Sequence, residues 1–197
     1  MKRILFILSA AVLCAVSCCQ SAPQASEGRT FLQLATDRYS VRSFDSKPVS
    51  QEDIDLILRA GQVAPTAVNS QPQKIYVVKS PEVIAKLAEA TPCLYGAPQC
   101  FVFCYNDDTV CQRGDKGNYG DIDVTIVLTH MTLQTAELGL GSCIVGYYDE
   151  AKLCEVLELP ANIHPVLVMP FGYPAADAAP SESHTSYRDL SETVEYK

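Results

Sequence analysis

The segment "DRYSVRSF", residues 37–44, places two arginines four positions apart with a serine between them. In an extended backbone, side chains at alternate positions point the same way, so Arg38, Ser40 and Arg42 can face one ligand together. Two guanidinium groups and a hydroxyl suit a phosphate ester, at ~1.5–3 kcal/mol for each charge-assisted hydrogen bond. The segment is therefore a candidate anion-binding site.

The alternative is that the arginines form ordinary surface ion pairs. Asp37 and Asp45 stand close to the first two, and Asp189 follows Arg188, a third arginine in the otherwise acidic C-terminal stretch. Such pairs are common at protein surfaces and contribute little to stability. The arginines alone leave both interpretations open.

The overall charge limits the partners of the chain. It carries 15 basic and 23 acidic residues, a net charge of −8, which becomes −10 if a leader containing Lys2 and Arg3 is removed. Such a chain has no general attraction for nucleic acid or for an anionic bilayer. Any anion that it binds must be held by a local cluster of positive charge.

A second candidate for ligand recognition is "APTAVNSQPQ", residues 64–73. Two prolines stiffen this connection, and short hydrogen-bonding groups come from Thr66, Asn69, Ser70 and Gln71. A simple turn needs only two or three such residues, whereas amide side chains can also pair with the edge of a heteroaromatic ring. By itself the stretch is weak support for a binding site.

Common catalytic and metal-binding patterns are absent from the sequence. "GLGSCI" has Ile144 where a dinucleotide-binding fingerprint has its third glycine, and Ser142 lacks the flanking glycines of a nucleophile elbow. The histidines at 130, 164 and 184 share no ligand spacing, and no paired CxxC motif predicts zinc. These observations argue against a hydrolase, a nucleoside triphosphatase and a metal site.

The apolar pattern predicts the elements that must position these residues. Helices are expected over residues 31–38, 51–62, 81–90, 121–138 and 149–159, and strands over 74–79, 99–105, 143–148 and 164–174. The helix at 121–138 is apolar nearly all round, which is typical of a helix buried in a core or across a subunit contact. The mixture indicates one α+β or α/β domain.

Several motifs in fixed order resemble the flavin-dependent nitroreductase family. They are "RYSVRSF", "KPV", an amphipathic helix and "APTAVNSQP" before a strand. The similarity continues through "GDIDVTIVLTHMTLQTAELGLGSCIVGYYD" and "FGYP" and ends at the arginine of "SYRDLSE". It covers residues 29–197, which we take as the domain.

The resemblance implies a fold and a cofactor. The fold is an α+β three-layer sandwich, a central and mostly antiparallel sheet flanked by helices. It forms an intertwined homodimer with FMN at each of two subunit interfaces. The helix at 121–138 would then be a dimer-interface helix.

The resemblance also assigns roles to residues. Arg38 and Ser40 would bind the FMN phosphate, and Arg188 would close this site. Arg42 would lie near the N1–C2 carbonyl edge of the flavin and the ribityl chain, where its charge would stabilise reduced FMN. The flavin of the partner subunit would be approached by Pro65, Thr66, Ala67 and Asn69. One side of the ring would be lined by the backbone of Ile144, Val145 and Gly146.

The implied activity is ping-pong hydride transfer. NADH or NADPH would reduce FMN, and a small aromatic substrate such as a nitroaromatic compound or a quinone would then accept the electrons in the same pocket. No side chain needs to act as acid or base, because the flavin carries the chemistry.

The first residues are typical of a secretory signal. A basic start precedes a largely apolar run of 13 residues, from Ile4 to Val16, which is too short for the ~20 residues of a spanning helix. The sequence around Cys18 looks like a bacterial lipoprotein signal, with residues 1–17 removed and lipid on the Cys18 sulfur. Residues 18–28 would be a flexible tether, and the protein would be exported and lipid-anchored to a bacterial membrane on its periplasmic or surface side. Cleavage at a nearby alanine without lipid is the alternative.

Six cysteines remain beyond the N-terminal region, at 93, 100, 104, 111, 143 and 154. Cys100 and Cys104 fall on one face of a predicted strand and are too far apart along it to bridge each other. Export would allow one disulfide among residues 93–111, and buried free thiols are the alternative.

Two further functions remain open. Nicotinamide donors are scarce outside the cytoplasm, so the same fold could perform other flavin chemistry, such as reductive dehalogenation or quinone reduction by another electron donor in the membrane. A membrane-tethered lipoprotein that binds flavin without turnover is the non-enzymatic alternative.

Overall fold

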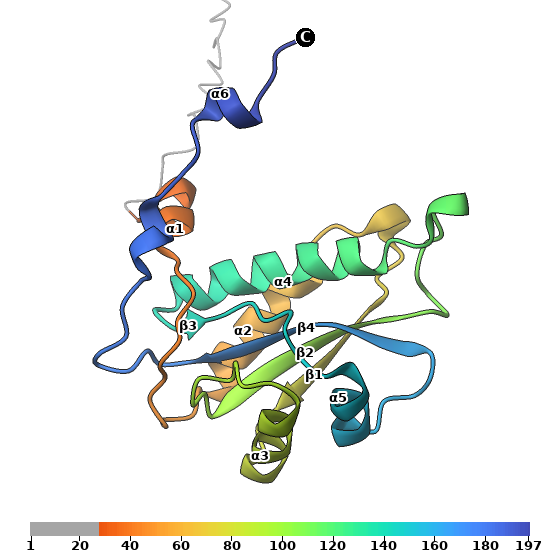
Figure 1. The fold of residues 1–197 in the computed structure, drawn as a ribbon, viewed down its shortest axis with the longest axis horizontal. Helices are drawn as coiled ribbons and strands as arrows, with labels where there is room; N and C mark the ends of the chain where they lie inside the picture. Colours follow the sequence, from red (N-terminus) through yellow and green to blue (C-terminus); the bar gives the residue numbers. More distant parts are fainter. Residues whose placement is uncertain (1–27) are drawn as a thin grey trace, which may run out of the picture.

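The computed structural model describes residues 28–197 (Figure 1). The predicted signal sequence at 1–17, the lipidation site Cys18 and nearly all of the tether at 18–28 lie outside these residues. Within the described part of the chain, no helix combines the length and the apolar character needed to cross a bilayer.

A four-stranded antiparallel sheet forms the middle of the fold. Its strands are β1 (Gln73–Val78), β2 (Gln99–Asn106), β3 (Gly141–Ser142) and β4 (Ile163–Gly172), in the order β1-β2-β4-β3. Side chains of the central strand β2 alternate between two cores. Phe101 and Phe103 enter one core, where the Phe101 ring stacks 4.3 Å from that of Phe171, and Val102 enters the other.

Helices cover both faces of this sheet (Figure 1). The described α-helices are α1 (Phe31–Asp37), α2 (Gln51–Gln62), α3 (Pro81–Ala90), α4 (Gly120–Glu137), α5 (Glu150–Leu157) and α6 (Leu190–Thr193). The sheet is covered by α2 to α5, whereas α1 contacts α4 and α6 lies away from the sheet (Figure 1). The buried side chains of α2 and α4 share the core of Phe101, and those of α3 and α5 share the core of Val102. The predicted α+β sandwich with a mostly antiparallel sheet between helices is confirmed.

Local sequence signals set the helix boundaries. The Ser50 side chain accepts a hydrogen bond from the Asp53 N–H at 3.1 Å and caps α2, and the Asp149 side chain caps α5 in the same way. Pro81 occupies the first turn of α3, where a missing N–H costs nothing. These helices begin where the sequence predicted.

Helix α4 is not buried on all sides in the single chain. Val124, Val127, Leu128 and Met131 are fully buried against α2 and the sheet. Another face displays Ile122, which is 41% exposed, and the half-buried Leu133. A groove of about 370 Å³ runs beside that face and is lined mainly by apolar side chains from α1, α2 and α4.

The predicted strand at 143–148 is wrong. The strand β3 covers only Gly141–Ser142, and Val145 makes one isolated pair with Val168 further along β4. The Cys143 N–H donates to the Pro170 carbonyl at 3.1 Å, but proline has no N–H to return a hydrogen bond. The ladder is therefore interrupted, and Ile144 and Gly146 are exposed.

The six cysteines from Cys93 to Cys154 are free thiols, so the structure contains no disulfide within residues 93–111. Cys100 and Cys104 lie on the same face of β2, as predicted. Burial raises the pKa of each of these two thiols to about 12.

Thiol labelling tests this burial. Native protein treated with iodoacetamide at pH 8 should leave Cys100 and Cys104 unmodified, because a pKa of about 12 leaves roughly one thiolate in ten thousand. Partly exposed Cys111 is the internal control and should react first. Peptide mass spectrometry would contradict the packing if all three were labelled at equal rates before unfolding.

Candidate functional site

The arginine segment, residues 38–42, leaves α1 in an extended conformation. The Val41 N–H donates to the Ser142 carbonyl at 3.0 Å, and Ser40 forms a parallel bridge with Ser142. Val41 is buried against Phe44, whereas Arg42 is exposed. The alternation predicted from the sequence is therefore present, with Val41 turned inward.

Neither Arg38 nor Arg42 has a carboxylate within 4.0 Å among residues 28–197. Asp37 pairs instead with Arg29 at 3.5 Å, and the Arg29 guanidinium also donates to the Ala136 carbonyl at 3.2 Å. Arg42 donates to the Ser40 carbonyl at 3.2 Å, and its hydrogen bond with Tyr95 counteracts the raised pKa of that phenol. The ion-pair alternative is wrong for Arg38 and Arg42, which leaves their charge available to a ligand.

All three side chains influence the Cys143 thiol, at the start of the 143–146 segment. Burial raises the pKa of this thiol, while the charge of Arg42, the hydroxyl of Ser40 and the charge of Arg38 act to lower it. Electrostatic influences extend over about 10 Å at moderate ionic strength, so the three side chains lie in the same region of the structure.

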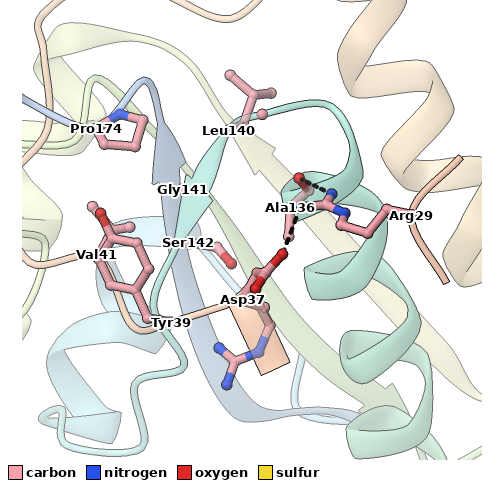
Figure 2. A pocket seen from close by; sticks show the side chains of 11 residues that line it. Arg29, Asp37, Tyr39, Val41, Ala136, Leu140, Gly141, Ser142 and Pro174 are labelled. Atoms are coloured by element: carbon pink, nitrogen blue, oxygen red, sulfur yellow. Dashed lines mark hydrogen bonds and ion pairs between the residues drawn. The ribbon is translucent and has the colours of Figure 1, made fainter. Parts of the chain in front are cut away.

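A pocket of about 170 Å³ adjoins this cluster (Figure 2). Figure 2 shows the Arg29 and Asp37 pair on one side of it and Tyr39, Val41 and Pro174 on the other, with Ser142 between them. Arg38, Ala136, Gly139, Leu140 and Gly141 complete the lining, which does not include Ser40 or Arg42. The pocket thus joins the arginine segment to the end of α4 and to β3.

Close approach of two backbones at this pocket requires glycine. A Cβ at position 141 would lie 2.9 Å from the Cβ of Val41, closer than side-chain atoms normally come. Gly139, with φ of 74°, ends α4 in the left-handed conformation that glycine adopts without strain. The glycines of "GLG" therefore end α4 and allow the arginine segment to approach β3. They do not form a dinucleotide-binding motif.

The residues predicted to line the flavin ring, Ile144 to Gly146, come shortly after β3 in the chain. Val145 is buried and exchanges two backbone hydrogen bonds of 2.9 Å with Val168. Ile144 is 43% exposed and Gly146 is exposed, and a Cβ at position 146 would meet only the Leu167 side chain within 4 Å. This segment presents an apolar side chain and bare backbone directly after Cys143.

The loop at 65–71 has an unusual backbone. Val68, Asn69 and Gln71 have φ values of 48°, 57° and 48°, in the left-handed region. Non-glycine residues pay roughly 1–2 kcal/mol there, and a β-branched valine is a clear outlier. Val68 is also 84% exposed, so burial of its side chain does not compensate. Strain of this kind concentrates at functional sites.

Local hydrogen bonds shape this loop. The Thr66 hydroxyl accepts from the Gln71 N–H at 3.0 Å, and the Gln71 amide donates to the Asn69 side chain at 3.0 Å. The Ala67 N–H donates to a carboxylate oxygen of Asp123 in α4, at 2.9 Å. Thr66 and Ala67 are half-buried, and Pro65 and Asn69 are exposed.

Asp123 is a residue that the sequence reasoning missed. It is 1% exposed in an otherwise apolar stretch of α4. A single acidic residue among inward-facing apolar positions was the signal available in "GDIDVTIV". Its partner in the loop could not be read from the sequence.

The two groups of predicted residues lie at opposite ends of α4. The loop contacts Asp123 in the first turn, and the pocket beside Arg38 is lined by Ala136 in the last. Thirteen residues at 1.5 Å per residue separate these helix positions by about 20 Å. One chain therefore does not bring the loop to the arginine segment.

Arg188 is not part of the pocket lining. Its side chain is 73% exposed and pairs with Glu192 at 3.2 Å, and Asp189 instead caps α6. Before it, His184 contacts the Thr36 carbonyl at 3.1 Å, and the chain then runs past α1 and away from the sheet (Figure 1). The single chain does not place Arg188 with Arg38.

Comparisons with known proteins agree on one family. The profile of the Nitroreductase family matches residues 35–95 and 91–173. An FMN reductase [NAD(P)H] of Bacillus subtilis is 30% identical over 167 residues, covering 75% of this chain and 67% of the relative.

Solved structures of the same family superpose on the fold. A nitroreductase family protein of Clostridium difficile 630 has a TM-score of 0.78 and 35% identity, over 85% of this chain and 98% of that one. A Desulfovibrio desulfuricans nitroreductase in complex with FMN has a TM-score of 0.72 and 25% identity, over 84% and 95% of the two chains.

The substitution Gly141→Ala tests the close approach at the pocket. The added methyl would meet Val41 and push the arginine segment from β3, at a cost of about 1–3 kcal/mol typical of overpacking. We expect a lower thermal unfolding midpoint, measured by circular dichroism, and weaker phosphate binding, measured by calorimetry. Gly172→Ala is the matched control, because Gly172 pairs with Gly141 in the sheet but a Cβ there meets its neighbours at 3.4 Å or more. Equal effects of both changes would contradict the account.

Proposed function

Because the chain belongs to the nitroreductase family, we propose that it is an FMN-dependent oxidoreductase. It takes electrons from NADH or NADPH and reduces nitroaromatic compounds, quinones or similar small oxidised molecules. The observation that carries this proposal is the pair of guanidinium groups at Arg38 and Arg42, without carboxylate partners among residues 28–197 of an acidic chain.

These groups fit the phosphate of FMN. Each guanidinium can form charge-assisted hydrogen bonds with a phosphate oxygen, at ~1.5–3 kcal/mol per bond. The Ser40 hydroxyl lies in the same cluster and adds a neutral donor. Holding two such charges together without an anion is unfavourable, so the cluster is better explained by an anionic ligand than by folding.

When bound, FMN supplies the redox chemistry between a nicotinamide donor and an oxidised substrate. The chain provides binding and charge. Arg42 would bring a positive charge to the edge of the ring, and the exposed Ile144 and Gly146 would offer it an apolar contact and bare backbone. No acidic or basic side chain is assigned to proton transfer.

The loop residues Pro65, Thr66, Ala67 and Asn69 complete the proposed site from a second chain. Two half-sites about 20 Å apart along α4 can both be completed if two copies pack with their α4 helices antiparallel, because a two-fold axis then brings each loop to the other arginine segment. The exposed Ile122 and the apolar groove beside α4 support this homodimer. The exposed C-terminal segment with Arg188 would reach the second chain.

We place the protein outside the cytoplasm, held to a membrane only by lipid on Cys18. Support comes from the basic start, the largely apolar run of 13 residues and the small residues before Cys18. Metabolic labelling with a fatty acid should mark the wild type and not Cys18→Ala. A membrane electron donor in place of NADH or NADPH is the alternative for that location.

The function is tested by purifying residues 20–197 gently and identifying any flavin released on denaturation. Bound FMN near one per chain is expected, followed by anaerobic bleaching with NADH or NADPH and recovery of colour with a nitroaromatic compound or a quinone. Reduction by dithionite but by neither nicotinamide would point to another donor. A colourless protein that FMN cannot reconstitute would refute the proposal.

Replacement of Arg42 by alanine tests its role. Losing one charge-assisted interaction of ~1.5 kcal/mol or more should weaken FMN binding at least tenfold and make the reduction potential of the bound flavin more negative. Lys86→Ala removes the same charge from the exposed face of α3 and serves as the control. Unchanged FMN content and potential in Arg42→Ala would count against the assignment.

A further inference from the structure

Asp123 is a buried acidic residue without a positively charged partner among residues 28–197. It lies in the first turn of α4, where the helix N-terminus favours negative charge, and its own N–H donates to the Tyr119 carbonyl at 2.8 Å. Burying a carboxyl group is costly unless its hydrogen bonds are satisfied. The presence of this carboxylate is therefore better explained by a hydrogen bond that it accepts than by packing.

What it holds is the loop at 65–71. Oδ1 of Asp123 accepts the Ala67 N–H across a sequence separation of 56 residues. The other side-chain hydrogen bonds of the loop join Thr66, Asn69 and Gln71 to one another. Within the described part of the chain, Asp123 thus makes the only side-chain hydrogen bond that ties residues 65–71 to another element.

The loop needs such an anchor because its conformation is strained. Val68, Asn69 and Gln71 are left-handed, and the exposed Val68 side chain packs too little to stabilise this shape. The start of α4 is itself fixed, since a Cβ at Gly120 would overlap the Tyr105 ring of β2. The anchor point is therefore rigid while the loop is strained.

Unsatisfied polar atoms gather at the same place. Three buried side-chain atoms lack a hydrogen-bond partner in residues 28–197, namely Ser70 Oγ, Gln73 Oε1 and Asp123 Oδ2. Ser70 belongs to the loop, Gln73 is the first residue of β1 two positions after it, and Asp123 accepts the hydrogen bond from the loop. Buried polar groups are normally paired, so these three atoms leave hydrogen-bonding capacity for water or for a second chain.

We propose that Asp123 is a positioning residue that holds the loop at 65–71 in its left-handed form and so sets the edge that the loop presents to FMN of the second chain. This inference rests on the proposed function for its cofactor part. The anchoring part concerns the chain alone. Asp123 touches neither cofactor nor substrate and acts through the backbone of Ala67.

Hydrogen exchange of the FMN-free protein tests the anchoring. Asp123→Ala should accelerate exchange of the amides at 66–71 at least tenfold, whereas Asp123→Asn keeps a carbonyl acceptor and should stay within about threefold of the wild type. Asp121→Ala is the matched control, because Asp121 is an exposed carboxylate of the same helix turn. Unchanged exchange in Asp123→Ala would overturn the proposal.

The cofactor part has its own readout. At full FMN occupancy, Asp123→Ala should shift the absorption and fluorescence of the bound flavin and change kcat more than the KM for the nicotinamide, and Asp123→Asn should restore both. A protein that is merely less stable would lose occupancy without a spectral shift, and that result would overturn the positioning role. A wild type that binds no FMN would refute the proposed function instead, while the exchange result still decides the anchoring.

A second pair of variants covers the case in which Asp123→Ala folds poorly. Val68→Gly removes the left-handed penalty of valine, so the loss of the anchor should cost less in that background. We expect Asp123→Ala to lower the unfolding midpoint less in Val68→Gly than in the wild type. Equal losses in both backgrounds would show that Asp123 does not oppose loop strain and would overturn the proposal.

Discussion

The backbone hydrogen bond from the Val41 N–H to the Ser142 carbonyl fixes the candidate site. It holds the segment after α1 against β3 and buries Val41, so the residues on either side must turn outward. Arg38, Ser40 and Arg42 all act on the Cys143 thiol at the start of the 143–146 segment. The approach is possible only because Gly141 has no side chain to meet Val41. A cluster of positive charge in an acidic protein thus follows from one close backbone contact.

Helix α4 sets the distance between the two parts of the site. Its buried side packs on α2 and the sheet, its first turn carries Asp123, and its last turn borders the arginine pocket. The helix is rigid, so one chain cannot close the separation of about 20 Å. The exposed apolar side of the same helix gives a second copy a surface on which to pack. The proposed homodimer and the proposed cofactor site would therefore both depend on this one helix.

Much of the fold follows from local signals in the sequence. Ser50, Pro81 and Asp149 mark helix starts because a cap or a missing N–H acts within one turn. The arginine segment could be predicted because alternation in an extended chain is also local. The interruption of the strand predicted at 143–148 could not be foreseen, because it depends on Pro170 of another strand. The left-handed Val68 and its anchor at Asp123 likewise depend on a contact 56 residues away.

Titration of flavin-free protein with FMN and with riboflavin tests the central claim most directly, because the two ligands differ only in the phosphate. Two or more charge-assisted hydrogen bonds from Arg38 and Arg42 predict that FMN binds about a hundredfold more tightly or better, and that added salt narrows the difference. Equal affinity for FMN and riboflavin would contradict the account, since the arginine segment would then hold something other than the phosphate.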